Sequence, residues 1–407
     1  MKITRLSWAV IEANYDWTIV RLDAEGGIHG IGEAYMGPGL TAILDELRPL
    51  VLGADAFQIE EIVRRLRGCT VHASPGVCFH AIAGIEAALW DLMGKALRQP
   101  VWKLLGGRFR DKVRIYADCH AGDALDSMSS VLQSRTPSWT GASSIAAGVS
   151  LKHHGWNPEE AEFPEPAQYR ARAREMAARG FTAVKFDADI PTPIPTDNYN
   201  RSLSRDEIEF VRERLRAVRE ELGTAIDFAV DCHWNYTVAG AVQLGRALAD
   251  LDLLWFEDPI PPESVRQLRA VQDGVPMPVA TGENHYLLTD FLRLIEDGGV
   301  RVLAPDPQKI GALDLKAISR LADTMATSLA IHNISGPVGT MFSAHICAAI
   351  PNFLALEWHG ASVPFFDDLA GPIIERGFIH LTDQPGIGLT LNEDVARRYA
   401  KPGEEFF

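Results

Sequence analysis

The 407-residue sequence has few basic residues, few cysteines and no long apolar run, and each shortage narrows the class of protein. Lys and Arg number 39 against 54 Asp and Glu, so the net charge is −15 and no nucleic-acid or anionic-membrane surface is expected. The five cysteines are scattered without a CxxC pair, which predicts no disulfide framework. The sequence does not open on a basic-then-apolar signal pattern, and no apolar run approaches the roughly 18 residues of a membrane helix. These absences favour a cytoplasmic metabolic enzyme.

The second half of the chain carries acidic and histidine residues at the ends of short apolar runs, at nearly equal steps. The steps are 26, 26, 23, 26 and 25 residues, about the length of one strand, one helix and two short loops. Equal strand–helix repeats predict an α/β fold with a closed parallel (β/α)7–8 barrel, whose active site lies at the carboxyl ends of the strands. The residues that we expect at that end are Asp231, Glu257, Glu283, Asp306, His332 and Glu357.

The regions outside this repeat differ in composition and predict a second, smaller domain. Residues 1–112 read as strands joined by tight turns and followed by helices, which indicates an α+β capping domain. Residues 113–358 form the predicted barrel, and 359–407, rich in Gly and Pro turns, are expected to return to the capping domain. Two insertions, 121–165 and 190–204, follow barrel strands and are expected on the active-site face, the first as a lid or as a contact in a homo-oligomer.

Three of the acids predict a metal site. Asp231, Glu257 and Glu283 end consecutive strands, and three carboxylates at one mouth repel unless a cation neutralises them. Oxygen ligands that leave room for water and substrate favour Mg²⁺ over Zn²⁺ or copper. Any one of them alone could simply cap the following helix, but three at equal spacing favour the metal.

Two histidines are candidates for proton transfer. His332 follows Asp306 by one repeat, so an acid on the adjacent strand would fix its tautomer, as a general base requires. His233 lies two residues beyond Asp231 on the same face, with no carboxylate partner evident in the sequence. It could also be only a hydrogen-bond partner of a metal ligand. Glu357 could bind a substrate oxygen or have a purely structural role.

With these residues and the motifs around them, the chain resembles the enolase superfamily. Within it, the chain resembles the mandelate racemase subgroup of acid-sugar dehydratases, such as those of galactonate, gluconate and mannonate. The resemblance implies that the three acids hold Mg²⁺, that a substrate carboxylate binds the ion, and that the adjacent proton is removed. It also implies that the capping domain closes the barrel with loops near Tyr15–Trp17 and His72–Val77. The motifs that carry it are "GIGEAY" (30–35), "AALWDLMGKALRQPVWKLLGG" (87–107), "VKFD" (184–187), "VDCH" (230–233), "FEDP" (256–259), "TGEN" (281–284), "PDPQKIGAL" (305–313) and "IHNISGPVG" (331–339).

The chain departs from this pattern on the second barrel strand. Many relatives carry Lys-x-Lys there, with the second Lys as a base, whereas this chain has Lys185 and then Asp187. Lys185 remains a candidate catalytic residue, and the Asp-x-His arrangement at His233 resembles galactonate and gluconate dehydratases.

We therefore expect a Mg²⁺-dependent dehydratase that takes a small carboxylate sugar to a 2-keto-3-deoxy acid, with His332 as base and His233 as acid. A racemase or epimerase of a 2-hydroxy acid, and a catalytically idle binding barrel, are the alternatives.

Overall fold

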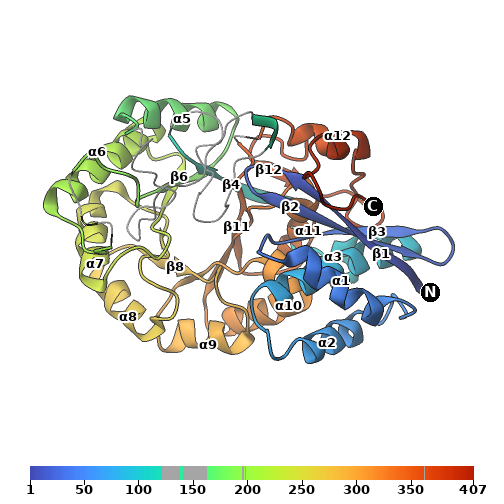
Figure 1. Cartoon of the computed structure of the whole chain (residues 1–407). Coiled ribbons are helices and arrows are strands. Elements are labelled where there is room, and N and C mark those ends of the chain that lie inside the picture. Colours follow the sequence, from blue (N-terminus) through green and yellow to red (C-terminus); the bar gives the residue numbers. More distant parts are fainter. Residues whose placement is uncertain (122–137, 141–162, 195–196, 198, 362) are drawn as a thin grey trace.

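The computed structural model describes residues 1–121, 138–140, 163–194, 197, 199–361 and 363–407. A ring of helices surrounds a parallel barrel, and an antiparallel sheet with its own helices lies against one side of it (Figure 1). The expected modified (β/α) barrel with an α+β cap is confirmed.

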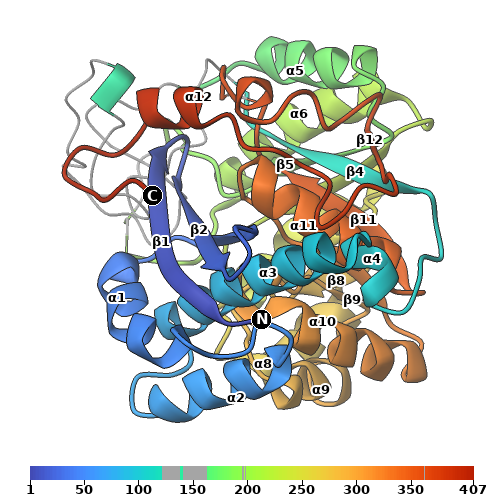
Figure 2. The same ribbon diagram turned by 90° about the vertical axis from the view of Figure 1, so that its right-hand side faces the viewer.

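The N-terminal part contains a three-stranded antiparallel sheet in the order β1-β2-β3. Strands β1 and β2 form a hairpin in which Glu12 pairs with Asp16. Helix α3 packs on β3 on one side and on the barrel helix α10 on another, so it lies between the sheet and the barrel (Figure 2). The elements are β1 (Ile3–Glu12), β2 (Asp16–Ala24), β3 (His29–Ala34), α1 (Leu40–Val51), α2 (Ile59–Cys69), α3 (Val77–Leu97) and α4 (Val101–Leu104), and α10 spans Pro307–Thr324.

The barrel closes because its last strand pairs in parallel with its first, with Glu357 opposite Tyr116. Each strand pairs in parallel with the next in the chain, so sequence order is also the order around the barrel. The strands are β4 (Lys112–Cys119), β5 (Ala183–Asp187), β6 (Asp227–Asp231), β7 (Phe256–Glu257), β8 (Val279–Thr281), β9 (Val302–Leu303), β10 (Ser328–Ile331) and β11 (Phe353–Trp358).

The connecting helices begin with recognisable start signals. Ser204 and Glu207 form a capping box at the start of α6, and Thr237 accepts a hydrogen bond from Gly240 N–H at the start of α7. Besides α10, the helices are α5 (Pro166–Ala178), α6 (Arg205–Leu222), α7 (Val238–Ala247), α8 (Val265–Gly274), α9 (Leu288–Glu296) and α11 (Pro337–Ala348), with short 3₁₀ turns at Ser138–Thr140, Ala249–Leu251 and Asp367–Leu369.

One layer of side chains fills the barrel interior and forms the floor of the mouth. Two large rings, Tyr116 and Trp255, meet edge to face at 5.2 Å between centroids, and the other strands contribute small residues. Trp255 also donates from Nε1 to Glu257 Oε2 at 2.8 Å. The packed floor thus fixes one of the acids above it. The small members of the layer are Ala183, Ala229, Ala280, Val302, Ala330 and Ala355.

The C-terminal segment contacts both parts of the molecule. Strand β12 (Phe378–His380) pairs antiparallel with the barrel strand β4, and helix α12 (Glu393–Arg398) follows. Beyond it, Ala400 and Phe406 form isolated bridges with β1 of the N-terminal sheet. The chain therefore does reach the capping sheet, but it extends the barrel sheet on the way. The division at residues 112 and 358 stays a prediction.

Helix α3 is long and apolar enough to cross a membrane by length and composition alone, but 83% of its most apolar window is buried inside the protein. It is the core helix of the N-terminal part, and we draw nothing more from it. All five cysteines are free, and Cys69 alone among them is exposed.

Candidate active site

Alternation along the strands carries polar side chains from the packed floor up to the mouth, because every second residue points inward. On β4 the floor residue Tyr116 is followed at two-residue steps by Asp118 and His120. Glu283 and His332 stand just beyond β8 and β10. Two-residue steps from the floor also place Lys185, Asp187 and Asp189 at β5, Asp231 and His233 at β6, Glu257 at β7, and Glu357 and His359 at β11.

The three predicted metal ligands come together in the structure. Asp231, Glu257 and Glu283 are buried, and one ligand oxygen of each lies within 4.8 Å of the others; we call them the carboxylate triad. Lys185 lies among these acids, with Nζ 2.8 Å from Asp231 Oδ2, 3.3 Å from Glu257 Oε2 and 2.7 Å from Glu357 Oε1. A second ammonium, Lys309 Nζ, lies 4.0 Å from Glu283 Oε1. Two ammonium groups cannot balance four carboxylates, so excess negative charge remains at the mouth.

Glu257 shows that a cation fits the triad. Its Oε1 is buried and has no hydrogen-bond partner in the part of the chain that the structure describes. Burial raises the pKa of Glu257 well above its ordinary value; Lys185 opposes the shift and Asp231 adds to it. A hard divalent cation would give the orphaned oxygen a partner and offset the repulsion, and an all-carboxylate set suits such an ion.

His332 has the acid neighbour that its position in the sequence predicted. Its Nδ1 lies 2.7 Å from Asp306 Oδ2, and its Nε2 lies 3.1 Å from Glu283 Oε2. Asp306 also caps α10, because its Oδ1 accepts a hydrogen bond from Gln308 N–H at 2.7 Å. Burial alone would lower the pKa of His332, but Glu283, Glu357 and Asp306 raise it to about 9.

His233 stands across the mouth and, contrary to expectation, has a carboxylate partner. Its Nδ1 lies 3.1 Å from Asp189 Oδ1, and its Nε2 lies 3.9 Å from Asp231 Oδ2. No feature of the sequence indicated this pair, because Asp189 lies two residues beyond the end of β5. His233 and Trp234 have φ of 41° and 62°, a left-handed conformation that non-glycine residues rarely adopt. Such strain is concentrated at functional sites.

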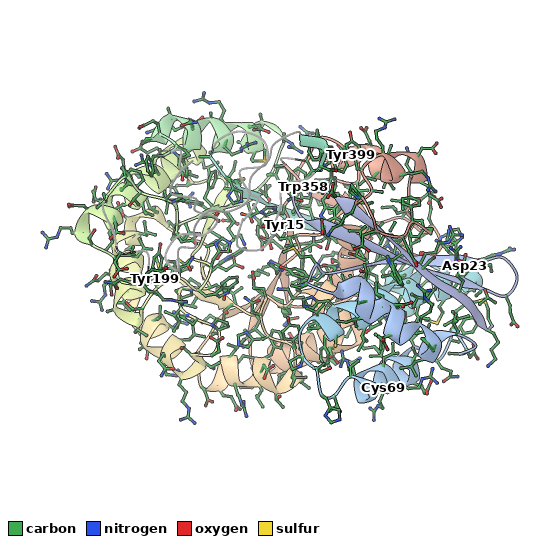
Figure 3. All side chains as sticks on the ribbon, in the orientation of Figure 1. Tyr15, Asp23, Cys69, Tyr199, Trp358 and Tyr399 are labelled. Atoms are coloured by element: carbon green, nitrogen blue, oxygen red, sulfur yellow. The ribbon has the colours of Figure 1, made fainter. Side chains whose placement is uncertain are left out.

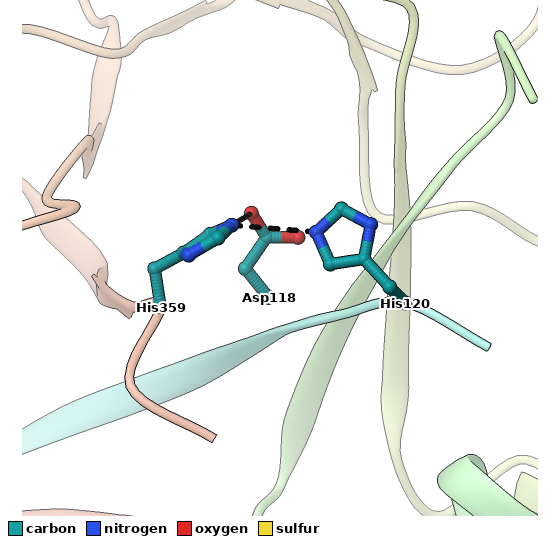
Figure 4. Close-up of side chains that lie close together, drawn as sticks. All are labelled: Asp118, His120 and His359. Atoms are coloured by element: carbon teal, nitrogen blue, oxygen red, sulfur yellow. Dashed lines mark hydrogen bonds and ion pairs between the residues drawn. The ribbon is translucent and has the colours of Figure 1, made fainter. Parts of the chain in front are cut away.

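A third polar group, Asp118, His120 and His359, escaped the sequence analysis (Figure 4). His359 Nε2 lies 3.2 Å from Asp118 Oδ2 and 3.3 Å from His120 Nε2. His120 Nδ1 in turn lies 3.0 Å from Asp187 Oδ2. The missed signal was the two-residue step: His120 and His359 follow Asp118 and Glu357 by two, as His233 follows Asp231.

The mouth opens into a cavity of about 380 Å³ between the barrel and the N-terminal part. Tyr15 and Asp16 line it, as expected of the first cap loop. In Figure 3, Tyr15 lies toward the middle of the molecule, and its ring centroid is 5.4 Å from the His359 imidazole. For the second expected loop, residues 72–77 are not among the lining residues, whereas residues 35–41 and His80, three residues beyond that loop, are. His80 Nε2 contacts the Tyr286 hydroxyl at 2.9 Å, which joins the cap to the barrel.

The two predicted insertions differ in how far they can be placed. Most of 121–165 lies outside the described residues. Within its described turn at Ser138–Thr140, Trp139 Nε1 donates to the Glu12 carbonyl oxygen at 2.6 Å. The segment 190–204 joins β5 to α6, and Arg201 donates to the Trp234 carbonyl oxygen at 3.1 Å, so it contacts the loop that carries His233.

A capped parallel barrel with a carboxylate triad and two histidines at its mouth defines a class of metal-assisted acid–base enzymes. Comparison with known proteins identifies the family. The model described as "Enolase C-terminal domain-like" matches residues 168–395, and "Mandelate racemase / muconate lactonizing enzyme, N-terminal domain" matches residues 8–106. The chain belongs to this mandelate racemase/muconate lactonizing enzyme family of the enolase superfamily, whose members use a divalent metal.

The relatives include sugar-acid dehydratases. The chain is 34% identical over 413 residues to the D-xylonate dehydratase of Haloferax volcanii, covering 100% of this chain and 90% of that protein. It is 29% identical over 396 residues to the D-gluconate/D-galactonate dehydratase of Picrophilus torridus, covering 96% and 90%.

A solved structure, the mandelate racemase/muconate lactonizing enzyme-like protein of Rubrobacter xylanophilus, has a TM-score of 0.88 at 35% identity, covering 100% of this chain and 99% of that one. The chain is therefore an enzyme of an acid-sugar dehydratase family.

Proposed function

We propose that the enzyme is a Mg²⁺-dependent dehydratase that converts an aldonate into a 2-keto-3-deoxy acid. The observation that carries this proposal is the placement of two histidine–carboxylate pairs, one at β6 and one at β10, on opposite sides of the mouth. Dehydration needs a base for the proton beside the carboxylate and an acid for the departing β-hydroxyl. The names of the relatives, D-xylonate and D-gluconate/D-galactonate dehydratase, support the substrate class.

The carboxylate triad would hold the metal. When bound there, Mg²⁺ supplies a Lewis acid that stabilises negative charge on the substrate carboxylate. Lys185 acts as a fixed cation rather than a base: burial would lower its pKa, but Asp231, Glu257 and Glu357 raise it well above its ordinary value. It positions the acids around it, and Glu357, which lines the cavity, would hydrogen-bond an oxygen of the reacting substrate.

The two histidines divide the proton transfers. Asp306 accepts the His332 Nδ1 proton, which leaves Nε2 as the nitrogen that takes the α-proton of the substrate. Glu283 contributes most among the acids that raise the pKa of His332, so a cation held by the triad would lower that pKa and favour an unprotonated Nε2. Asp189 holds His233 in the same way. Burial opposes protonation of His233, but Asp231 and Asp189 raise its pKa well above its ordinary value, which favours the imidazolium. It can give its proton to the β-hydroxyl, which leaves as water.

The test is a panel of mono- and diacid sugars with Mg²⁺, assayed for a 2-keto product. We expect turnover of at least one aldonate, with loss of activity in chelator and in the Glu257→Gln variant, whose fold should be intact by circular dichroism. Activity that survives chelation would overturn the metal assignment. Exchange of the α-proton with solvent deuterium without elimination would instead indicate a racemase or epimerase. If no acid sugar tightens Mg²⁺ binding, the barrel is catalytically idle.

A further inference from the structure

We propose that Asp118, His120 and His359 form a subsite for the hydroxyl groups that an acyclic sugar acid carries beyond its β-carbon. The inference rests on the proposed dehydratase function and narrows its substrate class. The enzyme would select polyhydroxy acids with at least one hydroxyl beyond the carbon that loses water, over three-carbon 2,3-dihydroxy acids.

The position of these residues in the barrel places them where the far end of such a substrate must lie. The carboxylate triad comes from β6, β7 and β8, whereas Asp118 and His359 come from β4 and β11, the neighbouring strands that close the ring. In the closed order β11 stands opposite β7. Asp118 and His359 line the same cavity as Asp231 and Glu283. A chain bound by its carboxylate at the triad would reach this group by extending across the mouth.

The tautomer of His359 is fixed by Asn14. The Asn14 Nδ2 lies 2.7 Å from His359 Nδ1 and 2.7 Å from the His359 carbonyl oxygen. An amide nitrogen only donates, so Nδ1 accepts and the ring proton is on Nε2. Burial lowers the pKa of His359 to about 3, which keeps the ring neutral. An N–H thus points from His359 toward Asp118 and His120.

His120 brings a second N–H to the same space. Its Nδ1 faces Asp187 Oδ2 at 3.0 Å; burial opposes protonation, but Asp187 raises the pKa of His120 to about 9. The ring is then an imidazolium, and its Nε2–H lies 3.3 Å from His359 Nε2. Two N–H groups cannot hydrogen-bond to each other, so each needs an oxygen acceptor of its own.

Asp118 supplies the complementary acceptor between the two rings (Figure 4). Its Oδ2 lies 3.2 Å from His359 Nε2, but its Oδ1 is buried and has no partner within the described chain. The residue Asp118 is only 6% exposed, so the orphaned oxygen is costly. A hydroxyl can donate to that oxygen and accept from an imidazole N–H, and neighbouring hydroxyls can do both at once. A substrate that lacks these hydroxyls leaves Asp118 Oδ1 and an imidazole N–H without hydrogen-bond partners. A site built from such polar groups discriminates strongly against that substrate.

A second metal ion is the competing occupant, because two imidazoles and a carboxylate are also metal ligands. A metal ion would need a free lone pair on His359 Nε2. Because Asn14 donates to Nδ1, the ring proton is on Nε2, and that lone pair is not available. The hydrogen bonds therefore support binding of substrate hydroxyl groups rather than of a second metal ion.

The test compares two acids on the full chain loaded with Mg²⁺: glycerate, which has the α-proton and β-hydroxyl only, and the fastest aldonate of the panel, starting with D-xylonate. In Asp118→Asn, the ratio of kcat/KM for the aldonate to that for glycerate should fall about 10- to 100-fold, the effect of a hydrogen bond to a charged group. Asp227→Asn is the matched control, since this acid pairs with Arg114 at the start of β6, and its ratio should not change.

Three other results are decisive. An equal loss on both acids overturns the subsite, and so does a second equivalent of bound metal that Asp118→Asn removes, measured by elemental analysis. If the wild-type protein dehydrates neither acid, the proposed function fails. The subsite is then tested by calorimetry: the wild-type preference in binding for the aldonate over glycerate should shrink in Asp118→Asn, and an unchanged preference overturns it.

Discussion

Each of the two histidines proposed for proton transfer contacts a carboxylate, but the two pairs differ in their other contacts. His332 Nε2 also lies 3.8 Å from Glu357, the acid beside Lys185. His233, in contrast, has a strained left-handed backbone and follows the triad member Asp231 by two residues. Strands β6 and β10 are four apart in a closed ring of eight, so the imidazoles approach a bound substrate from opposite sides. This separation lets removal of the proton be measured apart from loss of the hydroxyl.

Replacing each histidine by Asn should separate the two steps. His233→Asn should still exchange the substrate α-proton with solvent deuterium, while elimination slows by about 10²- to 10⁴-fold, the usual contribution of a positioned acid. His332→Asn should lose both exchange and elimination, since no base then reaches the α-carbon. Exchange is followed by NMR in deuterium oxide, and elimination by formation of the 2-keto product.

Asp189→Asn provides the control for the newly found pair. It should act as a weaker form of His233→Asn, slowing elimination and sparing exchange, because Asp189 contacts the reacting groups through His233 and its other oxygen accepts a hydrogen bond from Asn235 Nδ2. If His332→Asn keeps exchanging and His233→Asn does not, the roles are reversed. If Asp189→Asn slows exchange and elimination alike, Asp189 supports the site as a whole rather than the acid.

The sequence predicted the triad and the His332–Asp306 contact because regular spacing along the chain becomes adjacency around a barrel. It could not predict which groups face each other across the mouth. Asp189, His120 and His359 lie past the strand ends, where loop conformation decides the direction of a side chain. Lys185 is the residue whose role changed most: from the sequence it was a candidate for chemistry, and in the structure it is paired with three carboxylates.

At the scale of elements, the contact between β3 and α3 depends on glycine. A Cβ on Gly32 would lie 2.5 Å from both Ala88 N and the Gly84 carbonyl oxygen, so backbone rather than a flexible side chain would have to move. Gly32→Ala should therefore destabilise the protein by about 1–3 kcal/mol, the usual cost of overpacking. Urea unfolding monitored by circular dichroism measures this change.

Gly68→Ala is the matched control, because a Cβ there meets nothing within 4 Å and the residue lies in α2. That substitution should be neutral or stabilising by up to about 1 kcal/mol, since Ala is the better helix former. Equal destabilisation by the two changes would show that the close approach of β3 and α3 is not what limits position 32.

A buried acid from β3 joins the cap to the barrel helix α11. Glu33 accepts hydrogen bonds from the N–H groups of Gly336 and Gly339 at 2.7 and 2.8 Å. Burial nevertheless raises the pKa of Glu33 to about 7, with the two backbone hydrogen bonds opposing the shift. Between about pH 4.5 and 7, Glu33 therefore keeps its proton in the folded protein but has lost it in the unfolded chain. The contribution of this group to the free energy of unfolding falls as the pH rises through that range.

Glu33→Gln should remove this pH dependence. The difference in unfolding free energy between the variant and the wild-type protein should shift in favour of the variant from pH 5 to pH 8, whatever its size at pH 5. Urea midpoints at several pH values measure the shift. A difference that moves toward the wild-type protein over this range would mean that the two backbone N–H groups outweigh burial and keep Glu33 ionised.

Helices and strands with strong periodicity were predictable, and segments whose place is set by tertiary contacts were not. Strand β12 has only three residues and is held by pairing with β4, far away in the sequence. Residues 72–77 looked like a cap loop, but the cavity is lined by 35–41, since these directly follow the strand β3 that ends beside the barrel. Loop placement of this kind has no local signal.

For the whole molecule, the spacing of the repeats was enough to predict a closed barrel under a cap, but not how the two are joined. The joint is built from single contacts such as His80 with Tyr286 and Arg67 with Asp314, which join residues over 200 positions apart. Self-association and the cytoplasmic location remain predictions.

Because residues from both the cap and the barrel line one cavity, ligand binding should stabilise the whole molecule. Mg²⁺ alone should raise the unfolding temperature by relieving repulsion within the carboxylate triad, and Mg²⁺ with an aldonate should raise it further by filling the space between Tyr15 and His332. At 100 times its dissociation constant a ligand adds about 2.7 kcal/mol, enough to detect by scanning calorimetry. Glu257→Gln should lose most of the Mg²⁺ effect, whereas Asp227→Asn should keep it. Equal unfolding temperatures in Mg²⁺ and in chelator would show that no ion occupies the triad.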